Sequence, residues 1–341
     1  MSAARNDLED LAESVFGDAW GTGTALDSAL WATLEETGLA RLTLPEAAGG
    51  SGGTLVDAAE ILIAAGRFAA RVPLVETDLL AGWLLQAAGL EVPAGPLTAV
   101  LGAELKVPAV SGEPVSGTLR RVPWGRSAAG VVVLAGERVL LLDPASAQVT
   151  EGVNLAEEPR DELAFAGVVP LAAGTVPSRV QIEYPLRAAL GRALLLAGAA
   201  SSALAMAVRY ATERVQFGRP IARLQAIQQQ LALAGAEVAA AVAASQAAAL
   251  LAQRDGVVEA SLAIAAAKSR CGEAAGVVAR IAHQVHGAIG FTREHDLRLV
   301  TTRLWAWREE DGTEAQWNDR LGARALEAGP DGLWPLLTGT P

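Results

Sequence analysis

Two long apolar segments dominate the second half of this 341-residue chain. Leu186–Arg214 and Leu224–Arg254 are each about 30 residues long, consist largely of Ala and Leu, and are separated by Gly218-Arg219-Pro220. Ala and Leu favour helices, whereas Gly and Pro end them. Small Ala side chains also let neighbouring helices pack closely. Because a third such segment, Val257–His286, follows at once, we predict an antiparallel helical bundle.

The first part of the chain also has a helical pattern, but the middle does not. Apolar residues recur at helical spacing in four N-terminal segments: Asp7–Phe16, Asp27–Thr37, Thr54–Arg67 and Glu76–Ala88. From about residue 97 to 180, Val, Pro, Gly and Thr replace the helix formers, and Gly136-Glu137 joins two β-like runs as a type II′ hairpin loop would. We therefore predict a mainly α chain with an N-terminal helical domain at 1–95, a small middle β domain at 96–182 and a C-terminal helical bundle at 183–341.

Composition excludes several classes of partner. The net charge of −11 argues against nucleic acid, which requires clustered Lys and Arg. The longest uncharged runs, Ala193–Val208 and Val238–Gln253, are shorter than the roughly 20 apolar residues of a membrane span. Met1–Asp10 lacks the apolar core of a signal peptide. The single cysteine, Cys271, cannot form an internal disulfide and fits a reducing compartment. We expect a cytoplasmic protein that binds no membrane.

Two features that suggest ligand binding have simpler explanations. The glycine-rich segment Leu44–Gly53 follows no strand, has no Lys-Ser/Thr pair and lacks GxGxxG spacing, so we predict a structural turn and not a phosphate cradle. His283 and His286 share a helical face and His295 follows them, but a metal site needs further ligands in a fixed geometry. We therefore expect no metal.

Two sequence blocks carry more specific information. The first runs from Arg214 through Phe217-Gly218 to Ile221, followed by Gln225 and a Leu-Ala helix. Taken alone, its residues are an ordinary helix end, with a cation placed favourably for the macrodipole. As a string, it resembles the R-x-x-F-G-x-x-[IL] signature of the acyl-CoA dehydrogenase family. The second block, residues 282–297, is similar to the family's Q-x-x-G-x-x-G-[FY]-[ST]-x-E segment, and a weaker N-terminal match begins at Trp31.

This resemblance implies a fold, a reaction and a cofactor. The fold is a helical domain, a small β domain and a four-helix bundle, in chains that pair as homo- or hetero-oligomers. The reaction is α,β-dehydrogenation of an acyl-CoA thioester, with electrons passing to an electron-transfer flavoprotein. FAD lies across a subunit interface, and the matching cofactor-binding residues here are Arg214, Gln216, Phe217, Leu224, Gln225, Gln284, Gly287 and Thr313. Independently of the family, a guanidinium suits a diphosphate, and Gly287 lets the backbone approach a ligand.

The catalytic base implied by the resemblance is altered in this sequence. Most family members use a Glu in an E-G-T turn, and the same count from Gly290 falls on Asp311-Gly312-Thr313. Asp is one methylene shorter, and a displacement near 1 Å can cost on the order of 100-fold in rate. A small register shift would make Glu310 the base, whereas the alternative family position, near Leu186–Ala189, has no carboxylate. Two roles stay open for Asp311, and they do not exclude each other: a catalytic base, and a turn residue ahead of a helix that Thr313 caps with Gln316.

The β domain departs from the family further. The flavin-contacting motif T-E/S-P-x-x-G-S-D is not recognisable in Ala99–Lys106, and Trp124 does not supply the second motif, W-I-[TS]. This pattern resembles the short subunits of heteromeric acyl-CoA dehydrogenases, in which only some sites are complete. Two functions therefore stay open: a catalytic subunit, and a non-catalytic partner that completes the FAD site of a larger homologue. A flavin monooxygenase on the same fold is a third, and fatty, sterol and biosynthetic acyl groups are all compatible.

Overall fold

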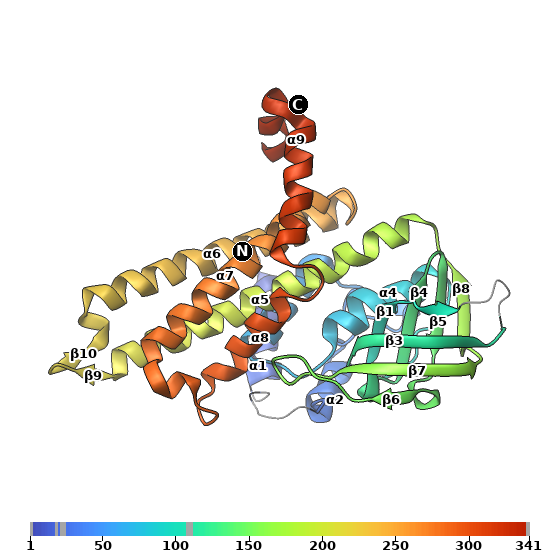
Figure 1. Cartoon of the computed structure of the whole chain (residues 1–341), viewed down its shortest axis with the longest axis horizontal. Coiled ribbons are helices and arrows are strands. Elements are labelled where there is room, and N and C mark those ends of the chain that lie inside the picture. The colour runs from blue at the N-terminus through green and yellow to red at the C-terminus, as the bar shows by residue number, and fades with distance from the viewer. Residues whose placement is uncertain (1–2, 18–19, 21–24, 107–111, 339–341) are drawn as a thin grey trace.

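Helices form both ends of the chain and strands form its middle (Figure 1). The computed structural model describes residues 3–17, 20, 25–106 and 112–338. The N-terminal helices are α1 (Ala3–Gly17), α2 (Ser28–Glu36), α3 (Leu55–Arg67), a π-helix (Val75–Gly82) and α4 (Trp83–Ala87). The C-terminal helices are α5 (Arg179–Glu213), α6 (Gln225–Asp255), α7 (Ser261–His286), α8 (Leu297–Arg308) and α9 (Glu314–Thr338). The predicted mainly α architecture is confirmed.

Two four-stranded sheets pack face to face in the middle region. Their strands are β1 (Leu97–Leu101), β2 (Leu105–Lys106), β3 (Val115–Pro123), β4 (Gly130–Ala135), β5 (Arg138–Leu142), β6 (Gln148–Thr150), β7 (Arg160–Val168) and β8 (Ala172–Thr175). One sheet has the order β1-β4-β5-β8 and the other β2-β3-β7-β6. The predicted hairpin is confirmed, because Ala135 pairs with Arg138 across Gly136-Glu137. Alternate residues of β4 face the space between the sheets and the helical core, so both of its faces are buried.

The helices α5 to α8 pack against one another as the bundle, and α3 lies across α5 (Figure 1). Two glycines bring α3 and α5 into backbone contact. A Cβ at Gly66 would stand 2.2 Å from the Leu195 carbonyl oxygen, and one at Gly198 would stand 2.0 Å from the Ile63 carbonyl oxygen. Only glycine fits at these positions, so the glycines fix how the N-terminal domain sits on the bundle.

Three segments can be compared with what the sequence predicted for them. Leu44–Gly53 is a closed turn whose amides serve its own chain: Gly50 N–H donates to Pro45 O, and Gly52 N–H donates to Leu44 O. Helix α5 starts at Arg179, ahead of the expected start of the bundle domain at residue 183, and Pro185 lies inside it. Glu76–Ala88 is not a uniform α-helix as expected, because Val75–Gly82 is π-helical. The wider turn buries three consecutive polar residues, each of which finds a partner in another element.

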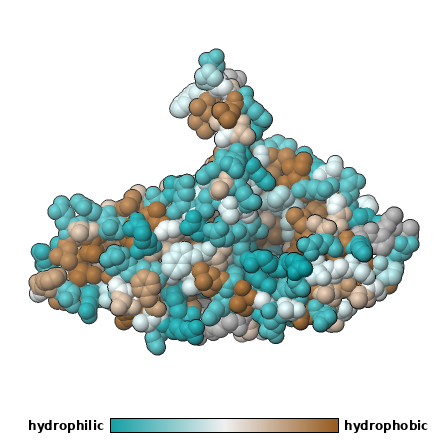
Figure 2. Space-filling view, viewed as in Figure 1, coloured by the Kyte–Doolittle hydropathy of each residue, from teal (hydrophilic) through white to brown (hydrophobic). Residues whose placement is uncertain are grey.

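Helices α5 and α6 are each long and apolar enough to cross a membrane by length and composition alone. The apolar window of α5 is 78% buried inside the protein, as in the core helix of a soluble protein, whereas that of α6 is 22% buried. Helix α9 leaves the body after Trp317, is kinked at Gly329 and projects alone (Figure 1). Apolar side chains gather on its projecting end (Figure 2).

Candidate functional site

The turn between α5 and α6 forms one tip of the bundle. Arg214 ends α5, and the strands β9 (Val215–Gln216) and β10 (Arg219–Pro220) follow as a short hairpin. Phe217 lies at its turn with φ 54° and is 87% exposed. Nothing in the described part of the chain forms an ion pair with Arg214, which is also exposed. An exposed ring beside a free guanidinium suits a ligand or a second chain better than a fold-stabilising role.

The second predicted block lies at the same tip. Tyr210, one turn before Arg214, stacks on His286 of α7 with ring centroids 4.5 Å apart. Exposed Gln284 and Gly287 border a cavity of about 490 Å³, whose other walls come from Arg280, His283, Ala288, Phe291 and Trp305. Gly287 has φ 65°, a conformation that glycine adopts without strain. The structure therefore brings together the two blocks, which lie about 70 residues apart in the sequence.

His283 helps to shape this cavity. Its ring lies against Phe291 (4.3 Å) and Trp305 (5.3 Å), and its Nε2 is 3.0 Å from Thr301 Oγ1. Burial, helped by the neighbouring His295, lowers the pKa of His283, which favours the neutral ring at neutral pH. Among the residues that the structure describes, no three His, Cys, Asp or Glu side chains are grouped to hold a metal ion. His283 therefore acts as part of an aromatic wall.

The predicted base lies elsewhere, in the turn between α8 and α9. Asp311 has φ 56° and Gly312 has φ 94°. Buried Lys268 holds this turn, because its Nζ donates to the carbonyls of Gly312 (2.6 Å) and Arg308 (3.0 Å). Burial, opposed by the nearby Asp311, lowers the pKa of Lys268 to about 8. Thr313 caps α9 together with Gln316: each backbone N–H donates to the other's side-chain oxygen, at 2.9 and 3.3 Å.

The Asp311 side chain is held by an arginine. Arg192 Nε donates to Asp311 Oδ2 at 2.8 Å, and Arg192 Nη2 donates to Glu76 Oε1 at 3.1 Å. Arg192 is 4% exposed and lies between these carboxylates, which come from a turn and from the π-helix. Burial disfavours its charge, but the attraction of Asp311, Glu310 and Glu76 more than compensates and raises its pKa. Burial also raises the pKa of Glu76, although Arg192 opposes it.

Glu310, the alternative base, is engaged as well. Its carboxylate accepts hydrogen bonds from Arg160 Nε (2.9 Å) and Nη2 (2.7 Å) and from Asn154 Nδ2 (3.0 Å). Burial would raise its pKa, but Arg160 and Arg192 outweigh burial and lower the pKa to about 2. Such a carboxylate binds protons weakly, so the geometry argues against the shifted register that would make Glu310 a base.

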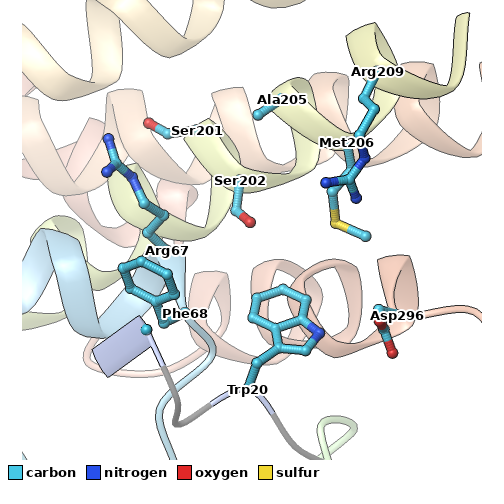
Figure 3. Close-up of a pocket in the computed structure, with 10 residues that line it drawn as sticks. Trp20, Arg67, Phe68, Ser201, Ser202, Ala205, Met206, Arg209 and Asp296 are labelled. Carbon is cyan, nitrogen blue, oxygen red and sulfur yellow. The ribbon is translucent and has the colours of Figure 1, made fainter. Parts of the chain in front are cut away.

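Two further cavities open along α5. Asp311 borders one of about 460 Å³, together with Tyr184, Ala188, Gly312 and Gln316. The other, of about 610 Å³, lies between the end of α3, the C-terminal half of α5 and Asp296 (Figure 3). Trp20 and Phe68 lie across it from Ser202 and Met206. None of the predicted site residues borders this second cavity.

The predicted residues thus form two groups within this chain. Arg214 and Arg192 are 22 residues apart on one helix (214 − 192), or about 33 Å along its axis. Thr313, expected beside the cofactor, lies with Asp311 in the second group. Sequence reasoning missed Arg192, Glu76, Lys268 and Arg160. One signal was available: Arg192 is the single charge in the apolar stretch 188–208.

Residues 187–326 match the family model for the acyl-CoA dehydrogenase C-terminal domain. Acyl-CoA dehydrogenase IpdE2 of Mycolicibacterium smegmatis is 32% identical over 282 residues, which covers 81% of each chain. The ChsE4-ChsE5 complex from Mycobacterium tuberculosis contains a similar chain, with a TM-score of 0.85, 24% identity and coverage of 97% and 99%. A steroid ACAD, Tcur3481-Tcur3483, gives a TM-score of 0.81, 25% identity and coverage of 95% and 98%.

Proposed function

Because the chain belongs to the acyl-CoA dehydrogenase family of oxidoreductases, we propose that it completes a FAD site on a second family chain. One observation carries this proposal. Within the described residues, the bundle tip exposes Phe217 and an unpaired Arg214 on the element that stacks, through Tyr210, on the helix with the cavity at Gln284. A free guanidinium fits a diphosphate, and about 490 Å³ lies in the range of ligand cavities.

The chain's own residues would hold and orient the cofactor. Arg214 would pair with the diphosphate, and Gln284 and Gly287 would approach the adenosine end. The side chains along the rest of the cofactor would be Gln216, Phe217, Leu224 and Gln225. When bound, FAD supplies the acceptor for the β hydride of an acyl-CoA thioester, and its electrons would pass to an electron-transfer flavoprotein.

The β domain supports a second chain as the owner of the flavin. Trp124, which does not supply the family's second flavin motif, is 4% exposed and packs inside the protein. It therefore cannot line an open flavin site. The steroid ACAD at 25% identity carries a two-part name, Tcur3481-Tcur3483, which supports an assembly of two different chains. A cytoplasmic location is part of the proposal. Burial raises the pKa of the Cys271 thiol to about 12, which suits a structural cysteine that stays reduced.

The competing function is dehydrogenation with Asp311 as this chain's own base and Thr313 beside its own flavin. One observation favours it, namely that Asp311 borders the 460 Å³ cavity.

The two functions differ in where flavin binds. We would purify the chain alone and together with a family chain encoded beside it, and measure flavin per chain and bleaching of the flavin band by acyl-CoA. We expect flavin and bleaching only in the pair, whereas full loading of the lone chain would refute the proposal.

Arg214→Ala tests the tip directly. Loss of a charge-assisted contact should weaken flavin binding by the pair by roughly 10- to 100-fold. The matched control is Arg120→Ala, which removes an arginine that is exposed on β3 and pairs with two surface glutamates, Glu104 and Glu162. This control should retain flavin. Equal retention by both variants would remove Arg214 from the site.

A further inference from the structure

Arg192 separates an open cavity from a closed interior. The open cavity, of about 460 Å³, is bordered by Asp311, which Arg192 contacts at 2.8 Å. Behind it lies a space of only about 10 Å³, bordered by Arg192, Glu76, Trp124 and Trp307. A single water needs about 10–15 Å³. The ion pair between Asp311 and Arg192 therefore stands between the cavity and a packed core.

Arg192 is held in place by three carboxylates. Arg192 contacts Asp311 at 2.8 Å, Glu76 at 3.1 Å and Glu310 at 3.5 Å, and it comes from a different element than each of them. The guanidinium fork can meet several carboxylates at once, which an ammonium group cannot do with the same geometry. Removing such a group would leave buried carboxylates uncompensated, so the side chain is strongly held.

The same contact engages the carboxylate that would have to act as a base. A base for an α proton needs a carboxylate that can reach the substrate. Arg192 Nε donates to Asp311 Oδ2 at 2.8 Å, so this oxygen is already occupied by a hydrogen bond within the protein. Asp311 is already withdrawn by one methylene relative to the Glu that the family places in this turn.

We infer that Arg192 closes this chain's own acyl site, by packing behind Asp311 and holding its carboxylate in an ion pair. This inference rests on the proposed function, in which the working site belongs to the second chain. Removal of the substrate's α proton then falls to a carboxylate of that chain. Arg192 is a positioning residue that acts through Asp311.

The first test is turnover by the assembled enzyme carrying Asp311→Asn. This isosteric change should leave kcat and kcat/KM within about 2-fold and leave their pH profiles superimposable. A loss of about 100-fold or more in kcat, with KM unchanged, would make Asp311 the base and overturn the inference. Flavin per chain is measured separately. A lone chain that binds a full complement of flavin but shows no turnover would refute the proposed function and leave Arg192's role standing.

The second test asks whether charge or packing links the two residues. Arg192→Met keeps length but removes the cation, so it should lower Tm by roughly 5–10 °C by leaving carboxylates uncompensated. Adding Asp311→Asn should then restore part of that loss. The control is Asp319→Asn, an exposed carboxylate at the same cavity, which should restore nothing. Equal effects of the two second-site changes would show that Arg192 does not act through Asp311.

Discussion

Single ion pairs in this protein differ widely in what they contribute. Glu310 and Arg160 pair at 2.7 Å with side chains 11% and 3% exposed. Arg324 and Glu327 pair at 2.9 Å, but both are more than 60% exposed. Exposed pairs contribute little, whereas breaking a buried pair leaves an uncompensated charge. The two glutamates therefore form a natural comparison for the acid stability of the fold.

We predict that Glu310→Gln removes an acid-sensitive part of the stability. The folded-state pKa of Glu310 is about 2, below its ordinary 4.5, so its stabilisation is complete above pH 4.5 and is lost as the pH falls towards 2. A shift of that size corresponds to about 3 kcal/mol. Tm of the variant should lie well below that of the parent at pH 7, and the gap should narrow between pH 4.5 and 2. Glu327→Gln is the control and should show no gap; a gap for Glu310→Gln that is constant with pH would contradict the prediction.

Residue contacts could be predicted only where they are local. Thr313 and Gln316 lie three residues apart, so their reciprocal cap follows from helix geometry. Arg192 and Asp311 lie 119 residues apart, and no spacing rule links them. The resemblance pointed to Asp311 but not to Arg192, which holds its side chain. This contact arises from tertiary packing, which the sequence pattern does not encode.

At the scale of elements, apolar periodicity and Ala/Leu-rich composition predicted several helices well. The segments predicted from Asp27 and from Thr54 form α2 and α3, with these two residues as their N-caps. The long Ala/Leu segments form α5, α6 and α7. The π-helix was missed because its cause is remote. Glu76 accepts a hydrogen bond from Arg192, Thr77 donates one to the Leu97 carbonyl, and Asp78 accepts one from Thr43. Apolar periodicity within 76–88 cannot predict these partners, because they lie in other elements.

The contact between α3 and α5 gives a prediction about two glycines. Gly198→Ala would place a Cβ 2.0 Å from Ile63 O and 2.8 Å from Arg67 N, so the helices must separate. We expect a loss of roughly 1–3 kcal/mol or more, because backbone cannot give way as a side chain can. Gly235→Ala is the matched control: its Cβ meets nothing within 4 Å, and alanine should stabilise α6 by up to about 1 kcal/mol. Denaturant unfolding measures both, and equal stability of the two variants would contradict this account of the packing.

At the scale of the whole molecule, three surfaces lack cover within the described chain. They are the bundle tip at Phe217, the outer side of α6 and the projecting end of α9. Composition correctly predicted the order helical, β, helical, because each region differs in residue type. It could not predict that α9 leaves the body, since the apolar residues of α9 look the same whether its own chain or another one buries them. Apolar surface of this kind marks an interaction with another chain.

The end of α9 therefore provides a test of assembly. Trp334 and Leu337 are 71% and 65% exposed beyond the kink at Gly329. In an oligomer these side chains would be buried against a second chain, and losing an interface aromatic often costs more than about 2 kcal/mol, or roughly 30-fold in affinity. We expect Trp334→Ser with Leu337→Ser to shift the assembled enzyme towards smaller species in light scattering, with the Tm of the separate chain unchanged. Arg324→Ser, an exposed change on the same helix, should leave the assembly intact, and an unchanged mass for the double variant would show that the end of α9 lies outside the interface.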